Sequence, residues 1–426
     1  MSTINVAAIK ADFPILSTTV RGGQPLVYLD SGATSQKPIA VLDAERDYYE
    51  QHNAAVHRGA HALAEMATDD FETARITIAN FVGARARDLV FTKNATESLN
   101  LAAYAFSNAT ALNKHDSRPI DPRFVLSPGD SIVITEMEHH ANLIPWQEVC
   151  RKTGATLRWI PLTDDGRLDL TNLDGLIDDT TKVVSVVHQS NILGTINPVE
   201  LLMERAHAVG AVGIVDGCQS VPHMPVDVHA LGADLVAWSG HKMLGPTGIG
   251  CLWGTEEILE AMPPFLTGGS MIQMVEMEKS TFAPPPQKFE AGTPVVAQAI
   301  ALAAGVRYLE NIGMRAIAQH EHALAQYTVN ALNNLDGVRV IGPTTAHERG
   351  SAVSFVVDGL HPHDVGQVLD SRGVAVRVGH HCAWPTCRHF GVPSTTRISP
   401  YIYNDTADID AAIEGISAAR EFVGVK

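Results

Sequence analysis

Lys242 stands in a stretch whose composition would let a lysine do chemistry. It follows a short apolar run, Asp234–Trp238, which predicts a buried strand. Ser239, Gly240 and His241 separate this run from the lysine, and a Gly/Pro-rich turn comes next. A lysine in a rigid loop at a strand end is either a solvated charge, which is the commoner case, or an amine that forms a Schiff base with a carbonyl compound. Residues elsewhere in the chain must decide between the two.

A carboxylate, Asp216, follows the predicted strand Gly213–Val215. A pyridine-ring cofactor bound to a lysine requires such a carboxylate, because it keeps the ring nitrogen protonated and the ring able to accept electrons. Considered alone, Asp216 would more commonly be a turn or cap residue.

Two further strand ends offer polar groups. The segment Phe91–Glu97 is a strand-to-helix turn, and the outward-pointing amides of the first helical turn suit a cofactor phosphate. An ordinary helix cap by Asn94 or Thr96 is the alternative. His139 follows the predicted strand Ser131–Thr135, where an imidazole could stack on a flat ring, although a histidine in a chain with 19 of them is more often structural.

Cys382 lies in a loop that follows a predicted strand of the C-terminal region, with Arg377, His380 and His381 nearby. Positive neighbours favour the thiolate, which is the nucleophilic form of cysteine. Two alternatives stay open. One is an inert buried thiol, and the other is a zinc site formed by the two histidines, Cys382 and Cys387, whose ligands are bunched rather than arranged in two separated pairs.

Arg397 is expected at the start of a strand. The guanidinium fork there would suit a bidentate grip on a substrate carboxylate. A surface ion pair is the ordinary alternative.

The elements that must position these residues alternate between strand and helix. Leu26–Leu29 predicts a strand, a helix begins at Pro38, and apolar residues from Leu63 to Phe81 recur at helical spacing. This alternation predicts a mostly parallel sheet with helices on both faces, and ligands beyond the carboxyl ends of its strands. Further strands are expected at Asp88–Thr92, Ser131–Thr135, Ala155–Leu162, Lys182–Val187, Gly213–Val215, Asp234–Trp238 and Ile249–Trp253, and helices at Thr96–Ala105, Asn142–Thr153, Leu173–Ile177 and Pro198–Val209.

The pattern changes after about residue 295, where an α+β region is expected. We therefore divide the chain into an N-terminal arm (1–25) that packs with the small domain, a large domain (26–294), and a small C-terminal domain (295–426) that carries the Cys382 loop. The small domain's elements are expected at Pro294–Asn311, Met314–Leu335, Val338–Ile341, Ala352–Val357, Asp364–Arg372, Val374–Val378 and Thr406–Val423.

The composition is that of a soluble globular protein, with 45% hydrophobic and 18% charged residues in a chain of 426. A net charge of −16 argues against binding to nucleic acid or to an anionic membrane, since both need basic patches. No N-terminal segment has the layout of a signal peptide and no apolar run reaches membrane-spanning length, so we expect a cytoplasmic protein. The five cysteines are odd in number and have no framework spacing, which predicts thiols rather than disulfides.

Taken together, these residues resemble the pyridoxal-phosphate (PLP) enzymes of fold type I. Within them the chain is similar to the SUF-type (group II) cysteine desulfurases of the class V aminotransferase family. The matching pieces follow the family's order over nearly the whole chain. They are Tyr-Leu-Asp30-Ser, Val-His57-Arg-Gly, Asn-Ala-Thr96-Glu, Glu-His139-His-Ala-Asn, Gln-Ser-Asn191-Ile-Leu-Gly-Thr, Val-Asp216-Gly-Cys-Gln219, Ser239-Gly-His241-Lys242, Phe-Glu-Ala-Gly-Thr293-Pro, Arg377-Val-Gly-His-His-Cys382-Ala and Thr-Arg397-Ile-Ser.

The resemblance implies a large domain built on a mostly parallel seven-stranded sheet and a smaller α+β domain. It implies that Lys242 binds PLP as a Schiff base, that Asp216 pairs with the ring nitrogen, that Gln219 contacts the ring oxygen and that His139 stacks on the ring. Because one phosphate contact would come from the other subunit, it also implies a homodimer. The implied phosphate site consists of Ala95, Thr96, Ser239, His241 and the other subunit's Thr293.

The implied reaction converts L-cysteine to L-alanine. Arg397 and Asn191 would bind the substrate carboxylate, and His57 and Arg377 also belong to the implied substrate site. The freed Lys242 would remove the α-proton.

The implied sulfur chemistry belongs to Cys382, which would attack the substrate sulfur and keep it as a persulfide. The sulfur would then pass to an acceptor protein for iron–sulfur cluster assembly. His363 matches the position through which some members of the family meet a zinc-bearing scaffold.

Two departures from the family pattern stand out. Cys218 takes the place of an expected alanine, and residues Ser107–Ser127 form an unusually long polar connection. The alternatives on the same scaffold are a selenocysteine lyase, a kynureninase-like hydrolase and an aminotransferase, of which the last two have no use for the Cys382 thiol. A non-catalytic scaffold that binds metal through His380, His381 and Cys382 is the alternative of a different class.

Overall fold

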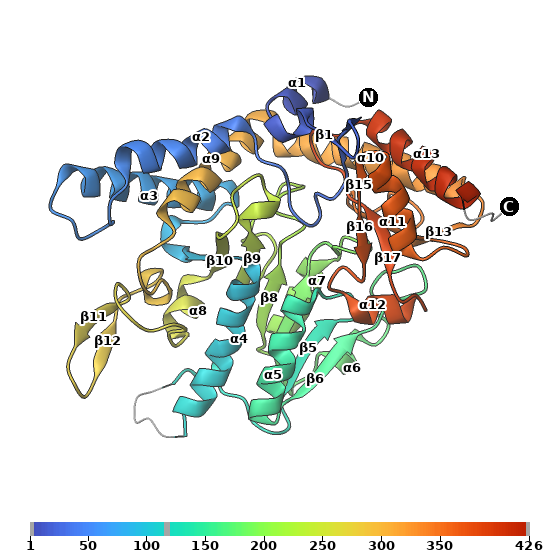
Figure 1. Cartoon of the computed structure of the whole chain (residues 1–426). Coiled ribbons are helices and arrows are strands. Elements are labelled where there is room, and N and C mark those ends of the chain that lie inside the picture. The colour runs from blue at the N-terminus through green and yellow to red at the C-terminus, as the bar shows by residue number, and fades with distance from the viewer. Residues whose placement is uncertain (1–3, 115–119, 423–426) are drawn as a thin grey trace.

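A seven-stranded sheet forms the centre of the large part of the molecule in the computed structural model, which describes residues 4–114 and 120–422 (Figure 1). Strand β10 runs antiparallel to β4 and β9, and the other neighbouring pairs are parallel, which confirms the predicted mostly parallel sheet. The strand order is β4-β10-β9-β8-β7-β5-β6. The strands are β4 (Leu89–Thr92), β5 (Ser131–Thr135), β6 (Thr156–Ile160), β7 (Thr181–Val187), β8 (Val212–Asp216), β9 (Leu235–Ser239) and β10 (Gly250–Gly254).

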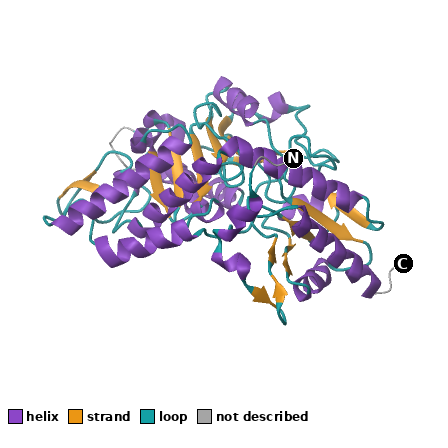
Figure 2. Ribbon diagram, turned by 90° about the horizontal axis from the view of Figure 1, so that it is seen from above, coloured by secondary structure: helices purple, strands orange, loops and turns teal. Residues whose placement is uncertain are grey.

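Helices cover the sheet on both sides, as the view from above shows (Figure 2). Buried faces on both sides explain why most of these strands appear in the sequence as continuous apolar runs rather than alternating ones. Helix α9 packs along α2 and α3 at one edge of this layer (Figure 1). The helices are α2 (Ile39–Asp47), α3 (Ala62–Phe81), α4 (Ala95–Leu112), α5 (Ile144–Thr153), α6 (Leu173–Leu176), α7 (Val199–Ala208), α8 (Glu256–Ala261) and α9 (Val296–Ile312).

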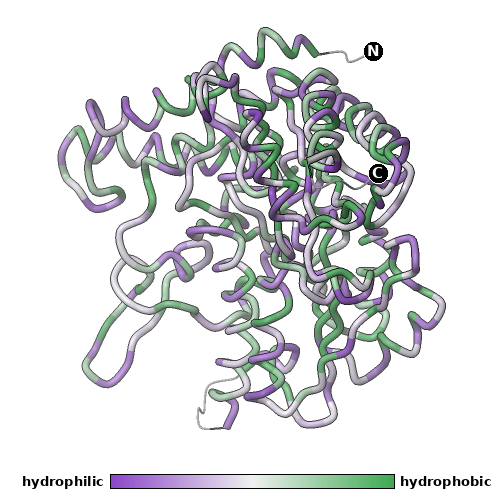
Figure 3. The backbone as a smooth tube through the Cα atoms, turned by 45° about the vertical axis from the view of Figure 1, so that its right-hand side comes forward, coloured by the Kyte–Doolittle hydropathy of each residue, from purple (hydrophilic) through white to green (hydrophobic). Residues whose placement is uncertain are grey.

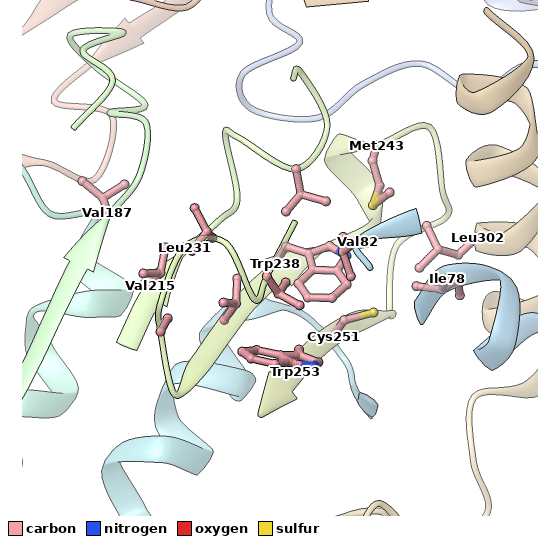
Figure 4. Packing of buried hydrophobic residues seen from close by; sticks show 14 of the residues in the cluster. Ile78, Val82, Val187, Val215, Leu231, Trp238, Met243, Cys251, Trp253 and Leu302 are labelled. Atoms are coloured by element: carbon pink, nitrogen blue, oxygen red, sulfur yellow. The ribbon is translucent and has the colours of Figure 1, made fainter. Parts of the chain in front are cut away.

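The loop that carries Lys242 is anchored in the largest apolar cluster. Met243, the next residue, is fully buried, and Figure 4 shows it near Leu302 of α9, with Trp238 and Trp253 of β9 and β10 below. Gly245 leaves no room for a Cβ, which would lie 2.5 Å from the Leu302 side chain and 2.9 Å from the backbone oxygen of Gly240. Each of these large buried side chains stabilises the fold by about 1.5–3 kcal/mol. The coloured trace alternates between hydrophobic and hydrophilic residues along the outer helices (Figure 3).

The small part of the molecule is an antiparallel sheet of order β13-β14-β17-β16 covered by helices, close to the predicted α+β region. The predicted strand near Leu26 forms, but it joins this part, because β3 (Val27–Tyr28) pairs in parallel with β15 (Val374–Ala375). The other elements are β13 (Val338–Ile341), β14 (Val353–Val357), β16 (Arg377–Gly379), β17 (Thr395–Ile398), α10 (Met314–Asn333), α11 (Pro362–Ser371), α12 (Trp384–His389) and α13 (Thr406–Phe422).

The N-terminal segment touches both parts of the molecule. Helix α1 (Val6–Ala11) is tied to α13 by the ion pair of Lys10 and Asp408, and Phe13 packs edge-on against Tyr308 of α9. The division of the chain at residue 294 stays a prediction. No described helix combines the length and the apolar composition that crossing a membrane requires.

Some elements differ from the prediction. Helix α4 continues to Leu112, so the first part of the expected polar connection Ser107–Ser127 is helical, while residues 115–119 within it lie outside the described residues. The hairpin of β11 (Ile272–Val275) and β12 (Ser280–Phe282) and the short helix α12 were not predicted. The hairpin projects from the large part (Figure 1), and because its apolar residues are exposed they give no burial pattern to read.

Candidate active site

A cavity of about 350 Å³ lies between the carboxyl ends of the sheet strands and the small part of the molecule. All the predicted site residues line it except His57 and Thr293. The residues that line the cavity and were predicted from the sequence are Ala95, Thr96, His139, Asn191, Asp216, Gln219, Ser239, His241, Lys242, Arg377, Cys382 and Arg397.

Lys242 and Asp216 form the floor of this cavity. Lys242 ends a 3-10 turn directly after β9 and lines the cavity. Asp216 ends β8, is 3% exposed, and accepts a hydrogen bond of 3.0 Å from the backbone N–H of Cys218. Burial raises the pKa of this carboxyl. The floor therefore combines a buried carboxyl with the amine of Lys242, whose charge acts on it.

The backbone beside Lys242 is fixed by donors that converge on one oxygen. The carbonyl of His241 accepts hydrogen bonds from Thr34 Oγ1 (3.1 Å), Ser35 Oγ (3.1 Å) and Lys37 Nζ (3.0 Å). Burial lowers the pKa of Lys37 to about 7. The sequence analysis did not identify Lys37 as a site residue. The only available signal was its position a few residues after the strand near Leu26.

The start of α4 forms one end of the cavity. Asn94 caps the helix through a hydrogen bond of 2.9 Å from the N–H of Glu97, and the N–H of Ala95 donates to Ser239 Oγ at 2.9 Å. The capping alternative for Asn94 is thus correct, and it is compatible with an anion site, because the helix dipole and the exposed Thr96 face the cavity. Gly250 permits this approach, since a Cβ there would lie 2.5 Å from the Asn94 backbone.

His139 lies over the cavity in its neutral form. Its Nδ1 accepts a hydrogen bond of 3.1 Å from the N–H of Ala141. Burial, together with the charge of Lys242, lowers the pKa of His139 to about 3. The preceding residue, Glu138, is fully buried and accepts hydrogen bonds from Asn142 and from the N–H of Val187, which fix the turn that presents His139.

The opposite wall is formed by Arg397, which is 2% exposed. It lies within β17 rather than at the start of a strand, and it donates to the carbonyl of Asn191 (2.9 Å) and to Asp30 Oδ1 (3.2 Å). Within the described residues, Nε of Arg397 and Oδ1 of Asn191 are buried without partners. Asp30 also lies 3.9 Å from Arg377. Its role was missed, although its position directly after a strand was the same signal that identified Asp216.

Cys382 reaches the cavity from the loop between β16 and α12 and is half-buried. His381 and Cys382 have φ angles of 52° and 56°, which non-glycine residues rarely adopt. The carbonyl of Cys382 accepts from the N–H of His140 (2.7 Å), and the carbonyl of His381 accepts from Asn191 Nδ2 (2.6 Å). The loop is therefore held by hydrogen bonds to its backbone.

The prediction that histidines supply positive charge to Cys382 is wrong for His381. Its Nε2 lies 2.8 Å from Thr395 Oγ1, and burial together with Arg397 and Arg377 lowers its pKa to about 2, so the ring is neutral. Positive charge on this wall comes from the arginines. No three His, Cys, Asp or Glu side chains of the described residues are placed to share a metal ion.

His57 and Thr293 lie outside the cavity, and a network of ion pairs connects the regions that carry them. His57 Nε2 is 2.8 Å from Glu72, and Glu72 is 3.1 Å from Nε of Arg75. Arg75 is 1% exposed and binds Glu290 at 2.6 Å, in the segment that leads to Thr293. The two residues thus belong to a separate face that one buried arginine organises.

Comparisons with known proteins agree with this arrangement. The profile of the aminotransferase class-V family matches residues 27–412. A probable cysteine desulfurase 2 of Mycobacterium leprae is 55% identical over 424 residues, which is 100% of this chain and 99% of the relative. A probable cysteine desulfurase of Streptomyces coelicolor is 56% identical over 422 residues, with 99% and 98% covered. The apo structure of the cysteine desulfurase from Thermococcus onnurineus NA1 matches with a TM-score of 0.90 at 38% identity, covering 99% of this chain and 100% of that one.

Proposed function

The chain belongs to the aminotransferase class-V family, and we propose that it is a PLP-dependent cysteine desulfurase that converts L-cysteine to L-alanine and stores the sulfur as a persulfide on Cys382. The observation that carries the proposal is the position of Cys382 in the wall of the same cavity as Lys242, Asp216 and Arg397. A thiol, an amine, a carboxylate and a guanidinium together are the set that this reaction needs.

The residues of the cavity fit the cofactor. When bound, PLP supplies a ring that accepts the electron pair of a substrate carbanion. The amine of Lys242 would hold its carbonyl carbon, and Asp216 would pair with its ring nitrogen. His139, neutral and fixed by Ala141, would lie on the ring face. Gln219 would contact the ring oxygen, and the phosphate would lie at the start of α4, with Ala95, Thr96, Ser239 and His241.

The substrate site lies on the opposite wall. Arg397 would bind the carboxylate of L-cysteine, because its buried Nε is unpaired and its other nitrogens are already oriented by Asn191 and Asp30. Arg377 would add positive charge at the mouth. The amine of Lys242, once released, would accept the α-proton.

The sulfur step belongs to Cys382. Its thiolate would attack the substrate sulfur, so that a sulfur–sulfur bond forms while the carbon–sulfur bond breaks. The electron pair of the broken bond returns to the substrate β-carbon, which takes up a proton and becomes the methyl group of alanine. The product on the chain is the persulfide Cys382–S–SH. Because the β-carbon is reduced as the sulfur is oxidised, the step needs no external oxidant.

Two predicted residues imply a second subunit. His57 and Thr293 lie on the separate face that Arg75 organises, and we propose that this face completes the cavity of a partner in a homodimer. Thr293 would then reach the partner's phosphate site. We also propose that the sulfur passes to an acceptor protein of a SUF-type iron–sulfur assembly system in the cytoplasm, and that the exposed His363, at the start of α11, serves docking of a zinc-bearing acceptor.

The Cys382→Ser variant distinguishes a desulfurase from the other activities expected on this scaffold. A desulfurase requires the Cys382 thiol, whereas an aminotransferase or a kynureninase-like hydrolase does not. We expect Cys382→Ser to bind PLP normally and to form no persulfide with L-cysteine. A variant that still releases alanine and sulfide at the wild-type rate would exclude the desulfurase mechanism. Parallel assays with selenocysteine would show whether a selenocysteine lyase is the better description.

A further inference from the structure

A buried carboxylate with no part in the proposed chemistry, Glu321, contacts residues from two separate parts of the chain, His223 and Ser351. It belongs to α10 and is 3% exposed. Both of its oxygens lie 3.0 Å from Nδ1 of His223, which is 6% exposed. Burying a carboxylate costs several kcal/mol unless it is paired and hydrogen-bonded, so these contacts hold Glu321 in one position.

His223 ends the segment that begins with Asp216. Two backbone hydrogen bonds of 3.0 Å make this segment a compact turn, one from Val221 to Gly217 and one from His223 to Ser220. Asp216 and Gln219, which line the cavity floor, are both in the segment. The contact between Glu321 and His223 therefore fixes the position of the floor.

A second contact of Glu321 leads to the opposite wall. Ser351 Oγ lies 2.9 Å from Glu321 Oε2 and 3.1 Å from the carbonyl of Pro400, which closely follows Arg397 in the chain. The next residue, Tyr401, packs edge-on against the His223 ring, with centroids 4.7 Å apart. Tyr401 also donates a hydrogen bond of 2.8 Å to the carbonyl of Pro222. Glu321 is thus the common partner of the floor segment and the Arg397 strand.

We propose that Glu321 is a positioning residue that holds the Asp216 segment and the Arg397 strand at a fixed separation. The inference rests on the proposed function, because this separation matters only if one amino-acid substrate spans both walls. The substrate carboxylate would lie at Arg397 while its α-carbon lies beside Lys242. A change in this separation weakens the contact of Arg397 with the substrate carboxylate in the ground state and the transition state alike, which raises KM more than it lowers kcat.

The test uses the PLP-loaded enzyme and measures KM and kcat for L-cysteine through alanine formation. Ser351→Ala removes only the hydrogen bonds that join Glu321 to the Arg397 strand, while the Tyr401 contacts with His223 and Pro222 remain. We expect KM to rise about three- to tenfold with kcat changed less than about twofold. Glu321→Ala removes both links and should raise KM by at least about tenfold and also lower PLP retention. Glu321→Gln should restore most of the loss, because an amide keeps an acceptor for Ser351 and a donor for His223.

His207→Ala is the control for loss of a histidine–carboxylate pair outside the cavity. His207 Nε2 lies 3.0 Å from Asp234 in a pair that is more exposed than that of His223 and Glu321, and Asp234 also accepts a hydrogen bond from Gly213 at the start of β8. We expect its KM and PLP content to match the wild type.

The inference is overturned if folded Ser351→Ala and Glu321→Ala keep the wild-type KM, or if His207→Ala raises KM as much as they do. If Glu321→Ala does not fold, Ser351→Ala decides alone. If the wild-type enzyme forms no alanine from L-cysteine, the proposed function is refuted. That outcome is distinct from those that overturn the role of Glu321.

Discussion

The floor of the cavity and the Cys382 loop are held by different kinds of contact. The floor rests on apolar packing, with the fully buried Met243 next to Lys242 and three side-chain donors on the carbonyl of His241. The loop has two consecutive residues with positive φ, and hydrogen bonds hold both its backbone carbonyls, one of them from Asn191, and the His381 ring beside Thr395. The residues that follow Cys382 in the chain are nevertheless buried, with Ala383 at 0% and Cys387 at 1% exposure in the main apolar cluster. The difference indicates that apolar packing positions the floor, whereas directional hydrogen bonds position the loop that carries Cys382.

The largest expected effect comes from removing the amine of the floor. Lys242→Ala should lower the rate of alanine formation by about 10²–10⁴-fold or more, because both the cofactor attachment and the general base are lost. The visible absorbance of the PLP-bound protein should change with it. Lys182→Ala, at the opposite end of β7, serves as the control and should leave both unchanged. Equal losses in the two variants would contradict the assignment of the floor.

Arg397→Lys tests whether Arg397, in the cavity wall opposite Lys242, binds the substrate carboxylate. A lysine keeps the charge but loses the forked contacts to Asn191 and Asp30, so KM for L-cysteine should rise about 10- to 100-fold while PLP binding persists. Steady-state kinetics with PLP absorbance measures both quantities. An unchanged KM would place the substrate carboxylate elsewhere.

A third prediction concerns acid stability of the protein without PLP. Burial lowers the pKa of His188 to about 4 and that of His381 to about 2, both below the value near 6.5 expected in the unfolded chain. Protonation then favours the unfolded state, so each group lowers the free energy of unfolding by about 1.4 kcal/mol per pH unit as the pH falls below about 6.5. Urea unfolding between pH 7 and pH 5 measures this slope. His381→Gln should reduce it, and an identical slope in that variant would mean that the loop opens before the ring is protonated.

The smallest expected effect is that of Cys218→Ala. Cys218 lies in the floor, where burial raises the pKa of its thiol well above the usual range, so it stays protonated. We expect alanine formation to change by less than about twofold, as for an ordinary substitution without a catalytic role. A change of tenfold would show that the floor holds a second working thiol.

The floor was largely predictable from the sequence, and so was the position of Cys382 in a loop, but the charge state of that loop was not. Asp216 and Lys242 each follow a continuous apolar run, and parallel strands bring their carboxyl ends to one edge of a sheet, so their meeting follows from the pattern. The protonation of His381 could not be predicted, because it depends on burial and on arginines that approach from a different strand. Residue spacing also could not predict that His57 and Thr293 lie outside the cavity of their own chain. The regions that carry them are joined by the ion pair of Arg75 and Glu290, which are far apart in the sequence.

The most direct test of the account follows the sulfur atom. The PLP-loaded protein is incubated with L-cysteine, alanine is quantified, and peptide mass spectrometry locates the added sulfur. We predict one alanine for each sulfur found on Cys382, and neither product in excess of background with Cys382→Ser. Alanine formed in full while the Cys382 peptide carries no extra sulfur, or equal turnover in Cys382→Ser, would contradict the central claim that the Cys382 loop receives the sulfur released at the floor.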